Sequence, residues 1–221
     1  ALRSGQIHMA FLPGFSFIQA EKVAGAKVLL KAVRKGRAYY YSAIVTGKDY
    51  KTIQDLKGKS MAWTDPSSAS GHIMAKSALM DMGLDPDTFF GKQVFAGGHD
   101  ALILSVVNKT VDAGATLSND PEGNDGIWHQ FLKKPEDLKK LRVLHVGKPV
   151  PGDTFSTTVK FYESHKEVVD KITKLMIELK NSPDGKKILS DLYRMDELVP
   201  ATPEEYEPLR AAAKRLGIGN H

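Results

Sequence analysis

The sequence predicts an α/β protein with mostly parallel sheets arranged in two lobes. Three observations lead to this prediction. Apolar runs of strand length alternate with helical patterns, glycine and proline separate them, and the apolar fraction of 42% allows a proper core. No run of about 18 uncharged apolar residues occurs, so no membrane-spanning segment is expected.

The first predicted elements are strands. HMAFL, residues 8–12, is apolar and ends at Pro13 and Gly14. Two β-rich runs follow at 26–33 and 38–47, separated by the turn RKGR. Residues 50–59 are expected to form a short helix that ends at a glycine, and 60–65, SMAWTD, the next strand.

The middle of the chain repeats the pattern of a strand followed by a helix. Apolar residues at helical spacing predict helices over 73–83 and 99–110, and the apolar runs 93–97 and 111–118 predict strands around the second of them. Further along, strands are expected at 141–147 and 154–161. Three helices then complete the prediction, at 165–181, 183–193 and 203–217.

Two lobes follow from how these elements are distributed. Residues 47–150 form a self-contained run of βαβ units, whereas 1–46 and 151–221 hold too few elements to be independent domains. We therefore expect the two flanks to pair into lobe 1, and 47–150 to form lobe 2. The chain then crosses twice between the lobes, which places a ligand-binding cleft between them.

Several functional classes are excluded or disfavoured by composition. The chain has no cysteine, which rules out disulfides, thiolate metal sites and cysteine nucleophiles. The net charge of +5 indicates a mild preference for anions. The lysines are interspersed with acids, however, which is typical of solvated helix faces, so no nucleic-acid partner is expected. The seven histidines show no metal-binding spacing, and no G-x-S-x-G or P-loop motif occurs. We expect no catalytic residues, no metal and no cofactor.

The first candidate binding element is DPSSASG, which lies between the strand 60–65 and the helix 73–83. A helix that begins at the carboxyl end of a strand offers unpaired N–H groups and the positive end of its dipole. Ser67, Ser68 and Ser70 add hydroxyl donors, and Gly71 lets backbone approach a ligand closely. These features predict a site for a compact oxyanion. The alternative is that Asp65 or a serine only caps the helix.

A second candidate is His99, which follows Gly97 and Gly98 at the start of the helix 99–110. Its imidazole can donate to an anion, or it can be a surface or capping histidine. Tyr40, in AYYYSAIV, and Asp153, in KPVPGDTF, lie near the two expected crossings. A tyrosine there can either donate to a ligand or pack, and a carboxylate near an anion requires a ligand with a proton or an ammonium group.

Taken together, these motifs resemble those of the periplasmic phosphonate-binding proteins of ABC importers. The similarity follows the order YxS, DPxSxSG, Gly-His at a helix start, VDA, and Pro-Gly-Asp before the last strand, and it covers nearly the whole chain. It implies a type 2 periplasmic-binding-protein fold and a periplasmic location, or one at the outer face of the cytoplasmic membrane. It also implies an ABC permease as partner and a ligand that is a phosphonate or a related phosphorus oxyanion.

The resemblance also implies roles for individual residues. Ser68 and Ser70, with neighbouring N–H groups, would hold the phosphonate oxygens, while Ala69 stands where the family often has threonine. Tyr40 and His99 would contact the ligand, and Asp153 would bond a protonated oxygen or an amine. Asp120 would be the second acid of the aminoalkylphosphonate binders, with Asn119 as the competing match.

Family members have a strand, a helix and a second strand ahead of the segment that HMAFL matches. The first lobe is therefore expected to be incomplete, with HMAFL on an exposed edge that either pairs with a second chain or distorts the lobe. Two alternatives to an importer component stay open: a periplasmic sensor-type receptor for a phosphorus oxyanion, and an enzyme on the same fold.

Overall fold

The computed structural model describes residues 1–47 and 49–219, which form two compact units. Unit 1 comprises Ala1–Tyr39 and Pro151–Arg210, and unit 2 comprises Tyr40–Val150 together with the residues from Ala211 onward. The sequence placed the first boundary at residues 46 and 47 and assigned the whole C-terminal segment to lobe 1. The observed first boundary lies earlier, and the last one falls within helix α10 (Glu207–Arg215).

Unit 1 contains a four-stranded sheet in the order β1-β8-β2-β9. Its strands are β1 (Met9–Leu12), β2 (Ala26–Val33), β8 (Thr154–Thr158) and β9 (Glu197–Pro200). Every neighbouring pair in this sheet is antiparallel, so the prediction of mostly parallel sheets is wrong for unit 1. The reason is that β8, which arrives from far along the sequence, pairs between β1 and β2. Alternation of strands and helices along the sequence indicates that consecutive strands run parallel, but it does not show which strands are neighbours in the sheet.

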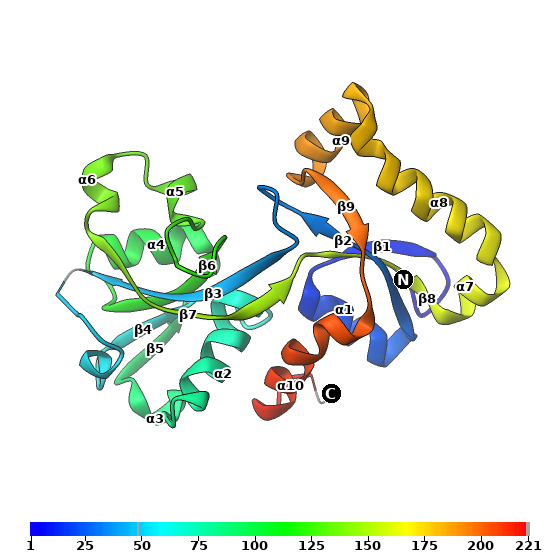
Figure 1. The fold of residues 1–221 in the computed structure, drawn as a ribbon. Coiled ribbons are helices and arrows are strands. Elements are labelled where there is room, and N and C mark those ends of the chain that lie inside the picture. Colours follow the sequence, from blue (N-terminus) through cyan, green and yellow to red (C-terminus); the bar gives the residue numbers. More distant parts are fainter. Residues whose placement is uncertain (48, 220–221) are drawn as a thin grey trace. The chain divides into compact units, whose positions relative to one another are not determined.

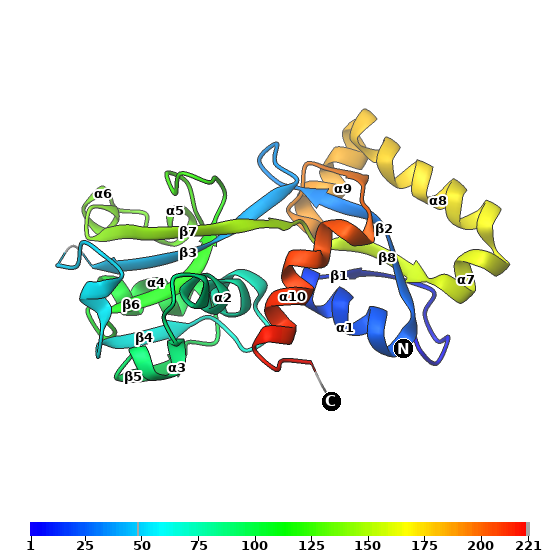
Figure 2. The ribbon, with the colours of Figure 1, turned by 60° about the horizontal axis from the view of Figure 1, so that its bottom comes forward.

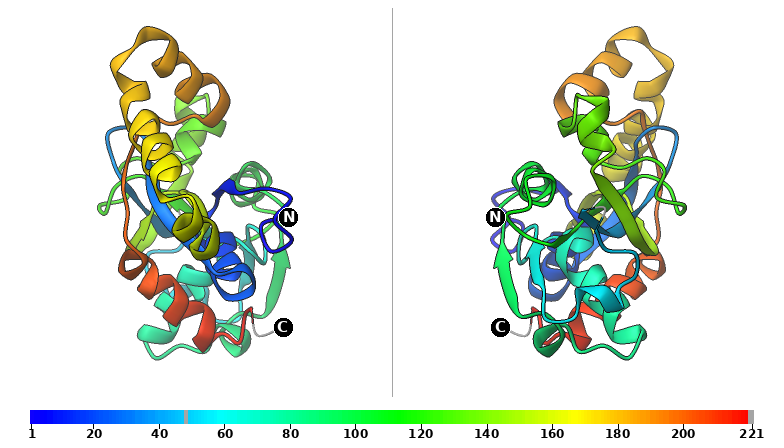
Figure 3. Two further views of the ribbon diagram at one scale, coloured as in Figure 1. Left: turned by 90° about the vertical axis from the view of Figure 1, so that its right-hand side faces the viewer. Right: turned by 90° about the vertical axis from the view of Figure 1, so that its left-hand side faces the viewer.

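Helices cover both faces of this sheet. They are α1 (Gly14–Ala24), α7 (Val159–Ser164), α8 (Lys166–Glu178) and α9 (Pro183–Tyr193), with short 3₁₀ turns at Leu179–Asn181 and Pro203–Tyr206. Val28 packs in a cluster with Phe17 of α1, whereas Leu30 packs in a cluster with Leu189 of α9. Residues two apart in a strand normally share a face, and a register shift between Val28 and Leu30 explains the switch. Figure 3 shows α1 and the α8–α9 pair on opposite sides of the sheet.

Unit 2 contains a five-stranded mixed sheet in the order β5-β4-β6-β3-β7. Its strands are β3 (Tyr39–Gly47), β4 (Ser60–Trp63), β5 (Lys92–Phe95), β6 (Ala113–Ser118) and β7 (Leu141–Pro151). Strand β4 pairs in parallel with both β5 and β6, and Figure 2 shows it between them. The carboxyl ends of these three strands therefore meet at one edge, where α/β proteins bind ligands.

The helices of unit 2 pack on both faces of its sheet. They are α2 (Met74–Asp81), α3 (Pro86–Phe89), α4 (His99–Val107), α5 (Trp128–Phe131) and α6 (Pro135–Leu138), with a 3₁₀ turn at Gln54–Leu56. Met61 of β4 packs in a cluster with Leu79 of α2, while the next residue, Ala62, packs with Leu102 of α4. The alternation puts α2 and α4 on opposite sides of the sheet (Figure 1).

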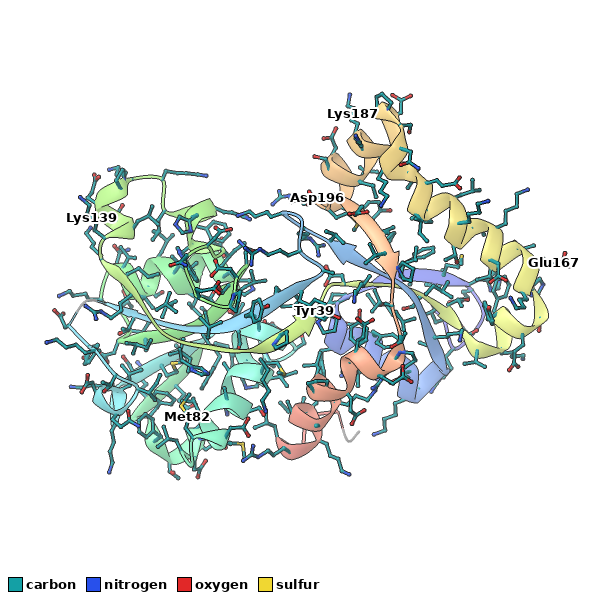
Figure 4. The ribbon with its side chains drawn as sticks, in the orientation of Figure 1. Tyr39, Met82, Lys139, Glu167, Lys187 and Asp196 are labelled. Atoms are coloured by element: carbon teal, nitrogen blue, oxygen red, sulfur yellow. The ribbon has the colours of Figure 1, made fainter. Side chains whose placement is uncertain are left out.

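Most predicted elements form close to their expected bounds, but several were missed. Helix α1 lies in a segment to which no element had been assigned, and β9, α3 and α7 were not predicted either. Lysines and acids on the helices are mostly exposed, as expected for solvated faces. Lys139, Glu167 and Lys187 are examples whose side chains extend away from the ribbon (Figure 4).

Candidate functional site

The segment from Asp65 to Ile73 is organised by its own side chains. The Asp65 carboxylate accepts hydrogen bonds from the backbone N–H of Ser67 (2.8 Å) and from its hydroxyl (2.6 Å). The Ser68 hydroxyl oxygen accepts a bond from the Gly71 N–H (3.0 Å), which makes Ser68 the N-cap of the next turn. The capping alternative is thus realised by Ser68, and the exposed Ser67 completes a tight Asp65 turn.

The chain then forms one π-helical turn, Ala69–Ile73, before α2 begins at Met74. The Ile73 N–H donates to the Ser68 carbonyl at 3.1 Å, and this bond between residues five apart in the sequence defines a π-helical turn. Such turns are frequent at functional sites. The first N–H groups of a helix have no partner within it, and here these belong to Ala69 and Ser70.

Gly71 serves packing inside unit 2. A Cβ atom at Gly71 would lie 2.1 Å from Thr64 Oγ1 and 3.1 Å from the Ala115 carbonyl oxygen. The Gly71 carbonyl also accepts a bond from the Thr64 N–H (3.0 Å). The close backbone approach that the sequence suggested for a ligand is therefore an approach to Thr64, which holds the turn against the ends of β4 and β6.

Ser70 differs from the two serines before it. The residue is only 3% exposed, and in the part of the chain that the structure describes its hydroxyl has no hydrogen-bond partner. Among the described residues no fully buried side-chain oxygen or nitrogen lacks a partner, so the Ser70 hydroxyl oxygen itself reaches the surface. A surface hydroxyl without a protein partner can bond water or a ligand. Among the described residues, Ser70 therefore keeps a hydroxyl donor available beside the backbone N–H groups of Ala69 and Ser70, which have no partner within the turn.

His99 is the first residue of α4, and its N-cap, Gly98, has no side chain to cap the helix. The imidazole Nδ1 lies 2.8 Å from Thr116 Oγ1 and 3.3 Å from Thr64 Oγ1. Burial lowers the pKa of His99, and the nearby Asp100 carboxylate only partly opposes that shift. The ring is thus held in its neutral form, with one N–H donor.

Thr64 connects the two motifs that the sequence singled out. It contacts Gly71 in the segment Ser67–Gly71, here called the serine turn, and it lies against His99. It also donates its hydroxyl to the Ala115 carbonyl of β6 (2.9 Å). The structure therefore brings Ser68–Gly71 and His99 together at the ends of β4 and β6. Sequence reasoning missed Thr64 and Thr116, although each is a hydroxyl residue at the end of a predicted strand.

Asp120 lies in a different environment. Its buried carboxylate accepts bonds from the backbone N–H groups of Glu122 (3.0 Å), Asn124 (3.0 Å) and Asp125 (2.5 Å). Burial alone would raise the pKa of the Asp120 carboxyl, but these N–H groups outweigh burial and lower it. The competing residue, Asn119, donates its side-chain amide to Asp125 (2.9 Å). Both side chains organise the loop that follows β6.

The two residues expected near the crossings lie in different units. Asp153, in unit 1, is partly exposed and accepts a bond from the Arg34 guanidinium at 2.8 Å. Tyr40 is the first residue of unit 2 and is half-buried in β3. Within the described residues, no cluster of histidine, aspartate and glutamate fits a metal ion, and no helix is both long and apolar enough to cross a membrane.

Comparison with known proteins identifies the family. Residues 1–206 match the model of the periplasmic substrate-binding proteins of phosphonate ABC transporters. The phosphonates-binding periplasmic protein of Escherichia coli K12 is 27% identical over 198 residues, which are 86% of this chain and 56% of that protein. The phosphate-import protein PhnD of Mycolicibacterium smegmatis is 26% identical over 230 residues, covering 94% of this chain and 68% of that one.

A solved structure supports the fold. PhnD1 of Prochlorococcus marinus in complex with methylphosphonate superposes with a TM-score of 0.75 at 20% identity, over 98% of this chain and 80% of that one. The chain thus spans only part of the length of these relatives, little more than half of the E. coli protein. Since the family model covers residues 1–206, this chain belongs to the family of periplasmic substrate-binding proteins of phosphonate ABC transporters.

Proposed function

We propose that this protein is the substrate-binding component of an ABC importer for a phosphonate or a related phosphorus oxyanion, in the periplasm. The observation that carries the proposal is that two donors lie at one sheet edge: the Ser70 hydroxyl, which has no hydrogen-bond partner among the described residues, and the neutral His99 imidazole. An oxyanion needs several hydrogen-bond donors in one place, and a site for transport needs no reactive group.

Each part of the serine turn has a proposed role. The Ser70 hydroxyl and the N–H groups of Ala69 and Ser70 donate to ligand oxygens, at the positive end of the helical segment that continues into α2. The Ser68 hydroxyl accepts from Gly71, so its own proton is available to the ligand. Ser67 and Gly71 position the turn, and Ala69 contributes only backbone.

The surroundings of Asp120 favour a ligand without an amino group. An aminoalkylphosphonate needs an acid for its ammonium group, and Asp120 already accepts three backbone bonds while Asn119 bonds Asp125. Methylphosphonate, phosphite and phosphate therefore rank ahead of 2-aminoethylphosphonate as ligands. His99 and the serine turn can donate hydrogen bonds to the phosphorus-bound oxygens of all four ligands.

The remaining expectations follow from the family. We propose that units 1 and 2 are the two lobes of the receptor, that Tyr40 and Asp153 contact the ligand, and that an ABC permease receives it. Asp153 would accept a bond from a protonated ligand oxygen while the Arg34 guanidinium holds its carboxylate in place.

Calorimetric titration with methylphosphonate, phosphite, phosphate and 2-aminoethylphosphonate tests the function. We expect saturable binding of at least one of the first three ligands, weaker binding of the aminoalkylphosphonate, and a further loss in Tyr40→Phe and Asp153→Asn. Sulfate serves as a matched tetrahedral anion that carries no proton near neutral pH. A folded sample that gives no heat with any of the four phosphorus ligands would exclude the proposed function.

Strand β1 is proposed as a self-association edge. It is the terminal strand of its sheet, and among the described strands it pairs only with β8, which leaves backbone groups on its other side for a second chain. Sedimentation equilibrium over a concentration series should show a dimer that Ala10→Pro weakens, because proline removes a backbone donor. A monomer at all concentrations would contradict this part of the proposal.

A further inference from the structure

Thr116 lies beside His99 but takes no part in the role proposed for the serine turn. It sits in β6 and is fully buried, and its hydroxyl lies 2.8 Å from His99 Nδ1. A neutral imidazole carries one proton, on Nδ1 or on Nε2, and only the nitrogen that carries it can donate to an anion. The hydroxyls around Nδ1 therefore decide what His99 offers to a ligand.

The hydrogen-bond partners of Thr64 and Thr116 determine the direction in which each hydroxyl donates its proton. Thr64 donates its hydroxyl to the Ala115 carbonyl at 2.9 Å, so toward His99 it can only accept. Among the described residues, the Thr116 hydroxyl has one partner, His99 Nδ1. If Nδ1 carried the proton and donated it to Thr116, the buried Thr116 hydroxyl proton would have no acceptor. Such an unsatisfied buried donor is costly.

We propose that Thr116 is a positioning residue, which donates its hydroxyl proton to His99 Nδ1 and thereby fixes the proton of the imidazole on Nε2. Nε2–H is then a permanent donor for an oxygen of the bound oxyanion. The proposal rests on the function proposed above, since it supplies the donor through which His99 would recognise a phosphorus oxyanion. Lowering of the His99 pKa by burial supports it, because the tautomer matters only for a neutral ring.

The consequence of removing the Thr116 hydroxyl follows from the same geometry. In Thr116→Val the remaining hydroxyl near Nδ1 is that of Thr64, at 3.3 Å, and it accepts. The ring would then prefer the tautomer with Nδ1–H, and Nε2 would present a lone pair to the oxyanion. We expect methylphosphonate, or whichever phosphorus ligand the wild type binds, to bind about tenfold more weakly to Thr116→Val. Thr116→Ser keeps the hydroxyl and should restore both the tautomer and the affinity.

The experiment is a long-range ¹H–¹⁵N correlation spectrum of the ligand-free, ¹⁵N-labelled protein, with His99 assigned from its absence in His99→Gln. The wild type and Thr116→Ser should show His99 protonated on Nε2, and Thr116→Val should shift toward Nδ1–H. Circular dichroism establishes that each variant is folded, and Thr116→Ala replaces Thr116→Val if the latter is not. Calorimetry on the same samples gives the affinities.

The outcomes separate this inference from the proposed function. Nδ1–H in the wild type, or an unchanged tautomer in folded Thr116→Val and Thr116→Ala, overturns the role of Thr116 even if the wild type binds methylphosphonate tightly. Absence of binding to every phosphorus ligand overturns the proposed function, while the spectrum still decides whether Thr116 controls the His99 tautomer.

Discussion

Two polar segments of unit 2 look alike in sequence and differ in what their polar groups do. Residues 65–73 follow β4 and residues 119–125 follow β6, and both combine an Asp-Pro pair with small polar residues. In the second segment the Asp120 carboxylate accepts hydrogen bonds from three backbone N–H groups of its own loop, so its acceptor positions are already used. In the first segment the Ser70 hydroxyl has no hydrogen-bond partner among the described residues and reaches the surface.

The difference teaches how a structural polar residue is distinguished from a ligand-binding one. Burial is common to Ser70 and Asp120, and so is a position after a strand end. What separates them is the state of their hydrogen-bonding groups, because a group already bonded to its own backbone has little to offer a ligand. Four substitutions test this distinction, and they are given from the largest expected effect to the smallest.

Gly71→Ala should be the most damaging change to stability. The new Cβ would lie 2.1 Å from Thr64 Oγ1 and 2.5 Å from Thr64 Cβ, so the turn or the end of β4 must move. We expect a loss of about 3 kcal/mol in the free energy of unfolding, measured by urea denaturation. Gly47→Ala is the matched control, because nothing lies within 4 Å of its Cβ position. Equal stability of the two variants would show that the serine turn does not depend on its packing against Thr64.

Asp120→Ala should come next, with a loss of about 2 kcal/mol at neutral pH, because three backbone N–H groups lose a charged acceptor. Affinity for the ligand should stay unchanged. Loss of binding in a folded Asp120→Ala protein would place Asp120 in the site and would reverse the comparison.

The effect of Asp120 should also depend on pH. The folded-state pKa of its carboxyl lies below the ordinary value of 3.8, so its contribution is complete above that value and disappears as pH falls through the lower folded-state pKa. Acid titration of the unfolding free energy should therefore show the gap between wild type and Asp120→Asn closing below pH 3.8. A gap that widens on acidification would mean that the carboxyl is protonated more readily in the folded protein.

Ser70→Ala should weaken ligand binding and leave stability almost unchanged, whereas Asp120→Ala should lower stability and leave binding unchanged. Its hydroxyl bonds nothing in the described protein, so stability should change by less than about 0.5 kcal/mol. Affinity should fall by about 1–3 kcal/mol if the hydroxyl meets a charged ligand oxygen, as calorimetry can establish. Unchanged affinity would remove Ser70 from the site.

Ser68→Ala comes last, with an expected loss of about 1 kcal/mol in the free energy of unfolding, because it removes the N-cap of the π-helical turn. Ser67→Ala is its matched neighbour, since among the described residues the exposed Ser67 hydroxyl bonds only Asp65. Thermal unfolding compares the two. If Ser67→Ala proved the more destabilising, the Asp65 turn rather than the cap would hold the segment.

Local signals in the sequence were sufficient for much of the fold and for the outline of the site. Alternating runs gave β2 at its observed bounds, and the glycines before His99 correctly placed the start of α4. The antiparallel insertion of β8 between β1 and β2 was not predictable, because strand pairing over such a sequence distance depends on packing that no local pattern encodes. Helix α1 was missed for a related reason: its segment, GFSFIQAEKVA, has a weak helical pattern and follows a Pro-Gly turn.

The site was predicted only as far as residue types allow. Serines after a strand and a histidine at a helix start suggest donors, and these segments do lie close together through Thr64. Sequence alone could not distinguish Ser67, which bonds Asp65, from Ser70, which bonds nothing described. Nor could it show that Asp120 is satisfied by its own loop, because that depends on how residues 122–125 fold back.

The most direct measurement is a ¹H–¹⁵N titration that follows every backbone amide as methylphosphonate is added, with phosphite and phosphate in parallel. If the oxyanion is held by the serine turn and His99, the largest shifts occur at Ala69, Ser70 and His99, and the amides of 122–125 stay where they were. Shifts centred on 122–125, with the serine turn unmoved, would contradict the account.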